Sequence, residues 1–264
     1  MIHYRTTKEI ALIQESAFIV GKTLGEVAKL LCPGVSLKTL DKVAETFIRD
    51  SGAIPSFKGY NGFPSTLCLS VNDVIVHGIP SDYQLKDGDI ISVDCGAKKN
   101  GYHADYAYTF MIGNVAEEVR NLCLRTKKAL YIGIEHAKAG NKTGDIGHAI
   151  QTYCEAFGYG VVRELTGHGC GRNLHEDPAV PNYGQKGCGA KLKKGMVFCI
   201  EPMINLGVRH IRVDRDQWTT RTADRFPSAH YEHMVALTDK GTEILSSYQW
   251  IYDVLPEQRD LIEK

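Results

Sequence analysis

The sequence of 264 residues lacks several features that mark special classes of protein. Lysine plus arginine and aspartate plus glutamate both total 31, so no net charge attracts nucleic acid or an anionic membrane. The beginning, MIHYRTTKEI, has no apolar signal-peptide region, and no apolar run is long enough to span a bilayer. The eight cysteines are scattered, without a Cys-x-x-Cys pair. We therefore expect a cytoplasmic protein with reduced thiols, not a disulfide framework or a structural zinc site.

What the sequence does contain is a repeated pattern. LKDGDIISVD, ending at Asp94, and LKKGMVFCIE, ending at Glu201, both place a carboxylate after a glycine and an apolar run. Upstream, GVSLKTLDKVAETFIRDSG and GNKTGDIGHAIQTYCEAFG both look like a polar cap, an amphipathic helix and a closing glycine. The two copies are offset by about 106 residues, which is too long for a solenoid repeat. The pattern predicts one domain, 1–264, built from two duplicated halves, about 1–112 and 113–250.

Hydrophobic periodicity predicts helices before strands in each half. Residues 6–9, TTKE, form a capping box, and apolar residues then recur at helical spacing from Ile10 to Leu31. A second helix follows Ser36 and closes at Gly52, and two more lie between about 116 and 157. Short β-prone runs follow each pair of helices. Helices that can cover one face of a sheet, twice over, predict an α+β fold.

Two aspartates occur close together in the strand region of the first half. Asp94 ends the apolar run IISV, where a carboxylate must be paired, protonated or bound to a metal ion. A four-residue hairpin loop, KKNG at 98–101, would place Asp105 directly opposite Asp94 across the ladder. Spacing alone leaves open that one or both point to solvent.

The second half adds acids that belong to the same region. Glu201 is the counterpart of Asp94, and Glu232 lies in AHYEHMVAL, which we expect to be a buried strand. Four carboxylates in one core require cations, and this arrangement suits two bridged metal ions. His168, flanked by glycines in TGHGCGRNLHEDP, is available as a nitrogen ligand.

At these residues the chain resembles the methionine aminopeptidases of the short bacterial type, type I. Six motifs occur in order along nearly the whole chain: VNDVIVHGIP, ISVDCG, YHADYAYTF, TGHGCGRNLHEDP, CIEPM and YEHMVAL. The resemblance implies the pseudo-twofold pita-bread fold, shared with prolidases, aminopeptidase P and creatinase. In this fold a central antiparallel sheet has helices covering one face.

The resemblance also implies roles for individual residues. The expected metal ligands are Asp94, Asp105, His168, Glu201 and Glu232, which would hold two divalent ions, Mn, Fe or Co. Asp94 would bind through both oxygens, and Asp105 and Glu232 would bridge the ions. His77 would contact the substrate beyond the scissile bond, and His175 would polarise the scissile carbonyl. Glu201 would also take a proton from water and pass it to the leaving amine.

The expected methionine pocket is where the chain departs from these relatives. Tyr60, Phe63, Cys68 and Trp218 match pocket positions, and aromatic rings suit a thioether. Three other positions differ from the family: Phe57 replaces a cysteine, Asn61 a frequent histidine, and Leu174 an aromatic residue. Ordinary packing or surface polarity is the alternative interpretation of each.

The resemblance therefore implies a dinuclear aminopeptidase that removes N-terminal methionine from nascent proteins when the second residue is small. It implies a cytoplasmic monomer that acts on peptide or nascent-chain N-termini and associates transiently with the ribosome, without recognising nucleic-acid sequence or binding membranes. A proline-directed peptidase of the same fold is one alternative, although such enzymes usually carry an extra N-terminal domain. A binding protein that has lost catalysis is another, although such relatives typically lack the metal ligands.

Overall fold

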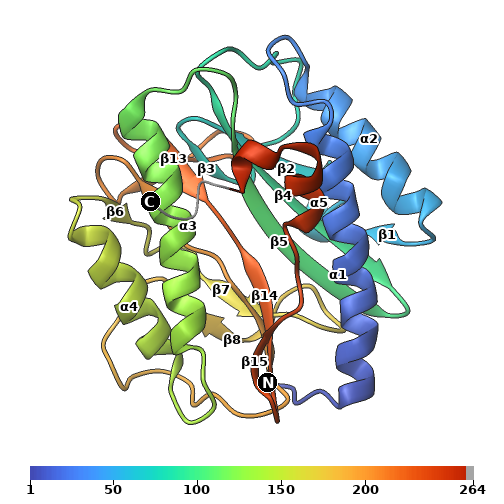
Figure 1. Cartoon of the computed structure of the whole chain (residues 1–264), viewed down its shortest axis with the longest axis vertical. Helices are drawn as coiled ribbons and strands as arrows, with labels where there is room; N and C mark the ends of the chain where they lie inside the picture. The colour runs from blue at the N-terminus through green and yellow to red at the C-terminus, as the bar shows by residue number, and fades with distance from the viewer. Residues whose placement is uncertain (260–264) are drawn as a thin grey trace.

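The computed structural model describes residues 1–259, and helices precede strands twice along the chain (Figure 1). First come α1 (Thr7–Ala28), α2 (Leu37–Asp50), β1 (Ile54–Pro55), the 3-10 turn η1 (Tyr60–Gly62), β2 (Leu67–Val71), β3 (Val74–Val76), β4 (Ile90–Lys99) and β5 (Tyr102–Met111). Then follow α3 (Glu117–His136), α4 (Thr143–Glu155), β6 (Gly160–Val161), β7 (Gly167–Gly169), β8 (Glu176–Val180), β9 (Val197–Ile200), β10 (Met203–Asn205), β11 (Ile211–Val213), β12 (Thr220–Thr222), β13 (Ser228–His230), β14 (His233–Thr238), β15 (Gly241–Ile244), α5 (Gln249–Val254) and the turn η2 (Pro256–Gln258). The four long helices lie where periodicity predicts them, while an origin of the two halves by duplication stays a prediction.

The ends of the first two helices follow their local sequence. Thr6 accepts the backbone N–H of Glu9 at 3.3 Å, and the Glu9 carboxylate accepts that of Thr6 at 2.9 Å, so the predicted capping box is formed. Ser36 caps α2, and Gly52 follows its end with a φ of 67°. Helix α1 ends at Ala28, before the predicted Leu31, because the chain tightens there into i→i−3 bonds ahead of a proline.

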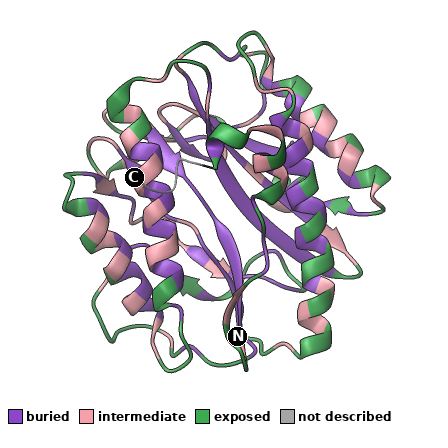
Figure 2. Ribbon diagram, viewed as in Figure 1, coloured by how far each residue is buried: buried purple, intermediate pink, exposed green. Residues whose placement is uncertain are grey.

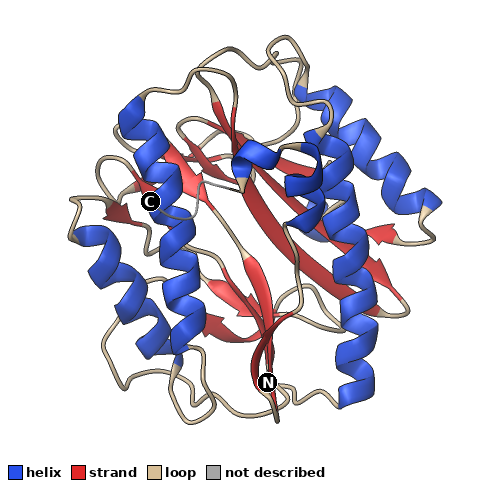
Figure 3. Cartoon of the chain, viewed as in Figure 1, coloured by secondary structure: helices blue, strands red, loops and turns tan. Residues whose placement is uncertain are grey.

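Strands and helices form separate layers, as expected for an α+β fold. All pairings between the named strands are antiparallel, in four small sheets: β1-β4-β2 with β5 on β4, β13-β10-β6, β11-β12-β3 and β15-β14-β9-β7-β8. In the view of Figure 3 most of these strands run between the pair α1 and α2 and the pair α3 and α4, while β1 lies beyond α1 and β6 beyond α3. The strands are largely buried, whereas each long helix keeps exposed residues on its outer face (Figure 2). Among residues 1–259, no helix combines the length and apolarity needed to cross a membrane.

Helix α1 covers one face of the β4–β5 hairpin and leaves the other face for polar groups. Tyr106 on β5 points toward α1, because its hydroxyl donates to the carbonyl of Ala17 at 3.0 Å. Successive side chains of a strand point to opposite faces, so Asp105 points away from α1. Val93 and Cys95 of β4 belong to the apolar core with Tyr106, which places Asp94 on the same face as Asp105.

The register of this hairpin corrects one prediction. Lys99 pairs with Tyr102, so the loop has two residues, Asn100 and Gly101, both with positive φ, 51° and 82°. Asn-Gly is the preferred sequence of such a two-residue turn. As a result Asp94 pairs with Ala107 and not with Asp105, and the prediction that the two aspartates are directly opposite is wrong. They are diagonal neighbours, and the offset of two residues keeps them on one face.

Glu232 also lies in a different local structure from the one predicted. It is buried, with 2% of its surface exposed, but it falls between β13 and β14 and not inside one continuous strand. Glu201 lies in a similar break between β9 and β10. The two breaks allow the chain to pass from the five-stranded sheet to the sheet of β13, β10 and β6.

Candidate metal centre

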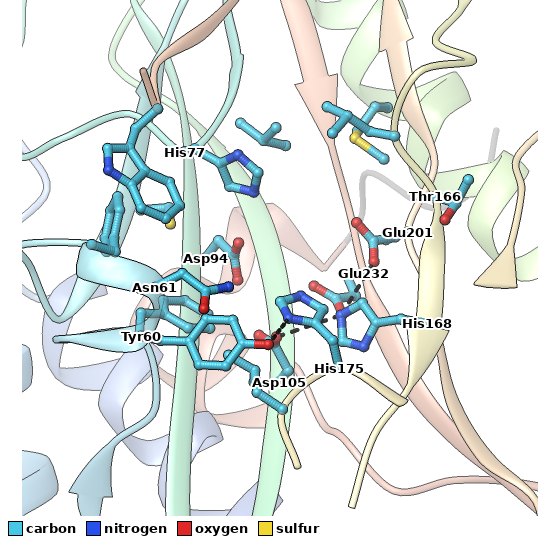
Figure 4. A pocket seen from close by; sticks show the side chains of 18 residues that line it. Tyr60, Asn61, His77, Asp94, Asp105, Thr166, His168, His175, Glu201 and Glu232 are labelled. Atoms are coloured by element: carbon cyan, nitrogen blue, oxygen red, sulfur yellow. Dashed lines mark hydrogen bonds and ion pairs between the residues drawn. The ribbon is translucent and has the colours of Figure 1, made fainter. Parts of the chain in front are cut away.

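One cavity of about 190 Å³ contains every residue that the sequence predicts for the site (Figure 4). Its lining comprises Phe57, Tyr60, Asn61, Phe63, Cys68, Val76, His77, Asp94, Asp105, Leu165, Thr166, His168, Leu174, His175, Glu201, Met203, Trp218 and Glu232. The lining comes from segments as distant as η1 and the break before β14. The fold therefore brings the predicted residues together, while their individual roles stay predictions.

The four acids converge in the interior of this cavity. Oxygens of Asp94, Asp105 and Glu232 lie within 4.8 Å of one another. Asp94 Oδ1, Asp105 Oδ1 and Glu232 Oε1 are buried and have no hydrogen-bond partner among the described residues. Glu201 points toward the same cluster (Figure 4). Buried polar atoms are normally paired, so these unpaired oxygens indicate a place for cations.

Burial of the acids changes their protonation. Removal from water raises the pKa of Asp94 to about 7. Burial, together with neighbouring carboxylates, also raises the pKa of Asp105, Glu201 and Glu232 well above the ordinary range. Like charges at this distance cannot all be ionised without compensation. Divalent cations would supply that compensation and would stabilise the ionised form of all four.

His168 on β7 supplies a nitrogen next to the acids. Its Nε2 lies 3.8 Å from Asp105 Oδ2 and 3.6 Å from Glu201 Oε1. Its Nδ1 lies 3.0 Å from the carbonyl of Gly169, which assigns the proton to Nδ1 and leaves the Nε2 lone pair facing the acids. Burial, and secondarily His175, lowers the pKa of His168 to about 3, so the ring is neutral. A neutral imidazole is the form that binds metal ions.

The donor set fits divalent metal ions. Four carboxylates and one imidazole are hard or borderline ligands of the kind that bind exchangeable divalent ions. A thiol that the sequence analysis missed lies behind them: Cys199 Sγ is within 4.8 Å of ligand atoms of His168 and Glu232, and it lies 3.6 Å from the carbonyl of Asp105. Its position two residues before Glu201, near the end of β9, was the available signal.

Two further imidazoles point into the cavity. His175, in the loop between β7 and β8, has its Nδ1 3.0 Å from the hydroxyl of Tyr60, and its ring centroid lies 4.1 Å from that of His168. His77 follows β3 with a φ of 57°, a conformation that non-glycine residues seldom adopt and that concentrates at functional sites. Burial lowers the pKa of His175, and burial followed by the proximity of His175 lowers that of His77 to about 4. Both rings are therefore neutral at neutral pH.

Apolar side chains line the cavity in two separate clusters. The first contains Phe57, Phe63, Cys68 and Leu174, with Tyr60, Ile79 and Trp218 packed against it. Phe57 and Leu174, two of the three positions that differ from the family, therefore belong to one buried group. Asn61, the third, lines the same cavity. The second cluster brings Val76, Met203 and Leu165 to the lining. Sequence analysis missed this second wall, although Val76 precedes His77 and Met203 follows Glu201 by two residues.

Comparison with known proteins identifies the class to which this fold and site belong. Residues 11–239 match the model of Metallopeptidase family M24. Methionine aminopeptidase 1 of Bacillus subtilis is 49% identical over 246 residues, which cover 93% of this chain and 99% of that protein. Methionine aminopeptidase of Escherichia coli is 39% identical over 247 residues, covering 93% of this chain and 94% of that protein. The chain therefore belongs to metallopeptidase family M24 and, within it, to the methionine aminopeptidases of the short bacterial type.

Solved structures agree with this assignment. The crystal structure of methionine aminopeptidase from Rickettsia prowazekii superposes with a TM-score of 0.92 at 39% identity, covering 94% of this chain and all of that one. Prolidase from Pyrococcus furiosus has a TM-score of 0.77 at 23% identity, covering 92% of this chain and 65% of that one, and this likeness concerns the fold alone. The pita-bread fold that the motifs predict is confirmed.

Proposed function

We propose that the protein is a dinuclear metal-dependent aminopeptidase that removes methionine from peptides and nascent chains whose second residue is small. The observation that carries this proposal is the cavity itself. Buried carboxylates with unpaired oxygens lie beside an apolar pocket and two neutral imidazoles. Membership of a family of metallo-aminopeptidases supports the same reaction.

In this proposal Asp94, Asp105, His168, Glu201 and Glu232 hold two divalent ions, Mn, Fe or Co. When bound, the ions supply the Lewis acidity that makes water a nucleophile at neutral pH. Asp105 and Glu232 would bridge the ions. Glu232 offers an oxygen close to Asp94 and Asp105 and also to His168, and Asp105 Oδ2 lies 3.8 Å from Nε2 of His168. The buried oxygens without a hydrogen-bond partner on Asp94, Asp105 and Glu232 support metal binding by all three residues.

The protein's own side chains then perform the proton transfers. Glu201 accepts a proton from the attacking water and passes it to the leaving amine, because its carboxylate lies in the cavity beside the other proposed ligands, with Oε1 3.6 Å from Nε2 of His168. The Tyr60 hydroxyl lies 3.0 Å from Nδ1 of His175, and in this proposal it donates there, which would leave the proton of this imidazole on Nε2. His175 can then donate from Nε2 to the scissile carbonyl and stabilise the negative charge that develops there.

Two pockets of different character account for the proposed specificity. The first pocket is largely aromatic and suits the long, unbranched thioether side chain of methionine. It is formed by the cluster of Phe57, Phe63, Cys68 and Leu174, with Tyr60 and Trp218 packed against it. The second residue would lie between His77 and the wall of Val76, Leu165 and Met203. A bulky side chain there would have to displace buried groups, so we expect discrimination against it.

The site also bears on the proposed partners. We also propose that the protein acts as a cytoplasmic monomer; the cavity is complete within one chain, so the proposed reaction needs no residue from a second copy. The segment 207–226, which brings Trp218 to the cavity, contains five arginines: Arg209, Arg212, Arg215, Arg221 and Arg225. Arg212 and Arg221 pair with Asp73 and Asp214, so the other three arginines are the groups that we propose for a transient, sequence-independent contact with the ribosome while a nascent chain is processed. Salt-sensitive cosedimentation with ribosomes would test this contact, and no cosedimentation at low salt would contradict it.

Peptide cleavage tests the proposed activity directly. The manganese- or cobalt-loaded protein is assayed by kcat/KM on Met-Ala, Met-Gly, Met-Lys, Leu-Ala and Ala-Pro peptides. We expect efficient cleavage of Met-Ala and Met-Gly, with about 100-fold or greater loss for Met-Lys and for Leu-Ala. Equal rates on Met-Lys and Met-Ala would refute the second-residue specificity. A preference for Ala-Pro would instead assign a proline-directed peptidase.

A further inference from the structure

The loop that carries His175 is held in an unusual way. It connects β7 with β8, and Arg172, Asn173 and His175 on it are exposed. An exposed loop of this length would ordinarily let a histidine sample several positions. A side chain that must meet a carbonyl group needs a fixed position, so the anchors of this loop decide how well His175 can act.

The first anchor is Glu176, the residue immediately after His175. Its carboxylate uses both oxygens: Oε1 accepts the backbone N–H of Asn173 at 3.0 Å, and Oε2 pairs with Nη2 of Arg5. The first bond closes the turn 173–176 around His175. The ion pair with Arg5 is buried, with 6% of the Arg5 side chain and 5% of the Glu176 side chain exposed.

Arg5 itself is fixed from both sides. It immediately precedes Thr6, the capping residue of α1, and its backbone N–H donates to the carbonyl of Gly195 at 2.6 Å. Its guanidinium packs directly on Gly171, where a Cβ atom would lie 2.4 Å from Nη2. Gly171 in turn accepts the backbone N–H of His103 at 2.7 Å. One arginine therefore contacts the loop at both ends, four residues before His175 and one residue after it.

We propose that Arg5 is a positioning residue that acts through Glu176 to hold the imidazole of His175 where it meets the scissile carbonyl. This inference rests on the proposed function, because it assumes the carbonyl-polarising role of His175. Arg5 does not line the cavity that holds the four clustered acids and the apolar pocket. Its loss should therefore reduce kcat and leave the metal content and KM nearly unchanged.

Variants that preserve packing test the proposal. The test variants, made in the metal-loaded full chain, are Arg5→Met and the double variant Arg5→Met/Glu176→Gln. The controls are Arg5→Lys, which keeps the positive charge, and Arg172→Ala. The double variant leaves no buried charge alone, and its glutamine can still accept the Asn173 N–H. We expect kcat for Met-Ala to fall about 10- to 100-fold in both methionine variants, with KM within about twofold. Arg5→Lys should recover part of the loss, and Arg172→Ala, a 63% exposed side chain on the same loop, should match the wild type.

A double-mutant cycle with His175→Ala separates positioning from general stability. If Arg5 acts through His175, Arg5→Met should lower kcat no further once His175 has been removed. Metal content and thermal unfolding are measured for every variant. An unchanged kcat in Arg5→Met, or an equal loss with and without His175, would overturn the inference alone. An unchanged kcat in His175→Ala would overturn the proposed role of His175 and the inference with it.

Discussion

Glu201 and Glu232 occupy directly opposite positions in a gap of an antiparallel ladder. On one side of the gap Ile200 pairs with His233, and on the other Met203 pairs with His230, in the same register. The backbone groups in the gap are satisfied from outside: the Glu232 N–H donates to Ala107 and the Tyr248 hydroxyl to the Glu232 carbonyl.

The gap explains how two carboxylates can meet inside the protein. In a regular strand each side chain must point to the face that the alternation of the strand assigns to it. A residue in a break of the strand is not held to that alternation, so its side chain can point in another direction. Both glutamates can therefore approach the aspartates of the β4–β5 hairpin. Because this brings four acids together, the site depends on cations, and the first prediction follows from that dependence.

Removal of metal ions should abolish activity, and Mn(II), Fe(II) or Co(II), added separately, should restore it. Asp94→Asn should lose metal ions and activity while the protein stays folded, because the substitution removes repulsion among the acids as well as a ligand. Metal analysis, circular dichroism and Met-Ala cleavage check these outcomes. Cleavage by the chelated protein at the untreated rate would show that the two-metal proposal is wrong.

Replacing His175 with alanine should reduce kcat about 100-fold or more without reducing metal content. The reason is that His175 lies outside the ligand set and would donate to the oxygen where charge develops. Tyr60→Phe, which removes only the hydroxyl 3.0 Å from His175 Nδ1, should produce a smaller loss of kcat. Steady-state kinetics with metal analysis on the same samples measure both effects. Turnover at the wild-type rate in His175→Ala would remove this residue from the catalytic set.

Replacing Trp218 with alanine should weaken substrate binding more than it slows the chemical step. Its ring packs edge-on against Phe63 at 5.2 Å and would form one wall of the proposed first-residue pocket. We expect KM for Met-Ala to rise about tenfold, equivalent to about 1.4 kcal/mol. Phe226→Ala, an exposed aromatic on the same segment, serves as the matched control and should leave KM unchanged. A wild-type KM in Trp218→Ala would place the methionine side chain elsewhere.

Lys127 provides a test of pH dependence away from the metal centre. Its side chain is buried, with 1% exposed, and its Nζ lies 3.3 Å from both the Tyr108 hydroxyl and the Gln258 carbonyl. Burial lowers the pKa of Lys127 from 10.5 to about 7. The folded chain therefore binds fewer protons than the unfolded chain between pH 7 and 10.5. The free energy of unfolding should gain about 1.4 kcal/mol per pH unit from this group as pH rises through that window.

Lys127→Met should remove this pH dependence and stabilise the protein at pH 7, where the buried charge is otherwise costly. Urea unfolding at pH 7 and pH 9 measures the difference in slope between variant and wild type. Lys138→Met, at an exposed lysine, should keep the wild-type slope. Identical slopes in Lys127→Met and the wild type would mean that Lys127 stays charged in the folded protein.

Much of the fold and of the site can be predicted from the sequence. The capping box of Thr6 and Glu9, the Ser36 cap and the glycine after α2 involve residues only a few positions apart, so local chemistry decides them. The four acids and the glycine-flanked His168 are conspicuous in an apolar sequence, the other site residues were implied by the resemblance, and all of them line one cavity. These predictions depend on neighbouring residues, on composition or on motifs. They therefore hold even where the pairing of strand residues is predicted incorrectly.

Tertiary structure alone decided the relations between distant segments. A two-residue turn made Asp94 and Asp105 diagonal neighbours, and the paired strand breaks made Glu201 and Glu232 opposite neighbours. The ion pair of Arg5 with Glu176 joins residues 171 positions apart in the chain. Such contacts depend on how every intervening element packs, since a shift of one residue in a strand sends its side chains to the other face. The sequence therefore determined which groups are available for the proposed chemistry, and the closed fold determined how those groups face one another.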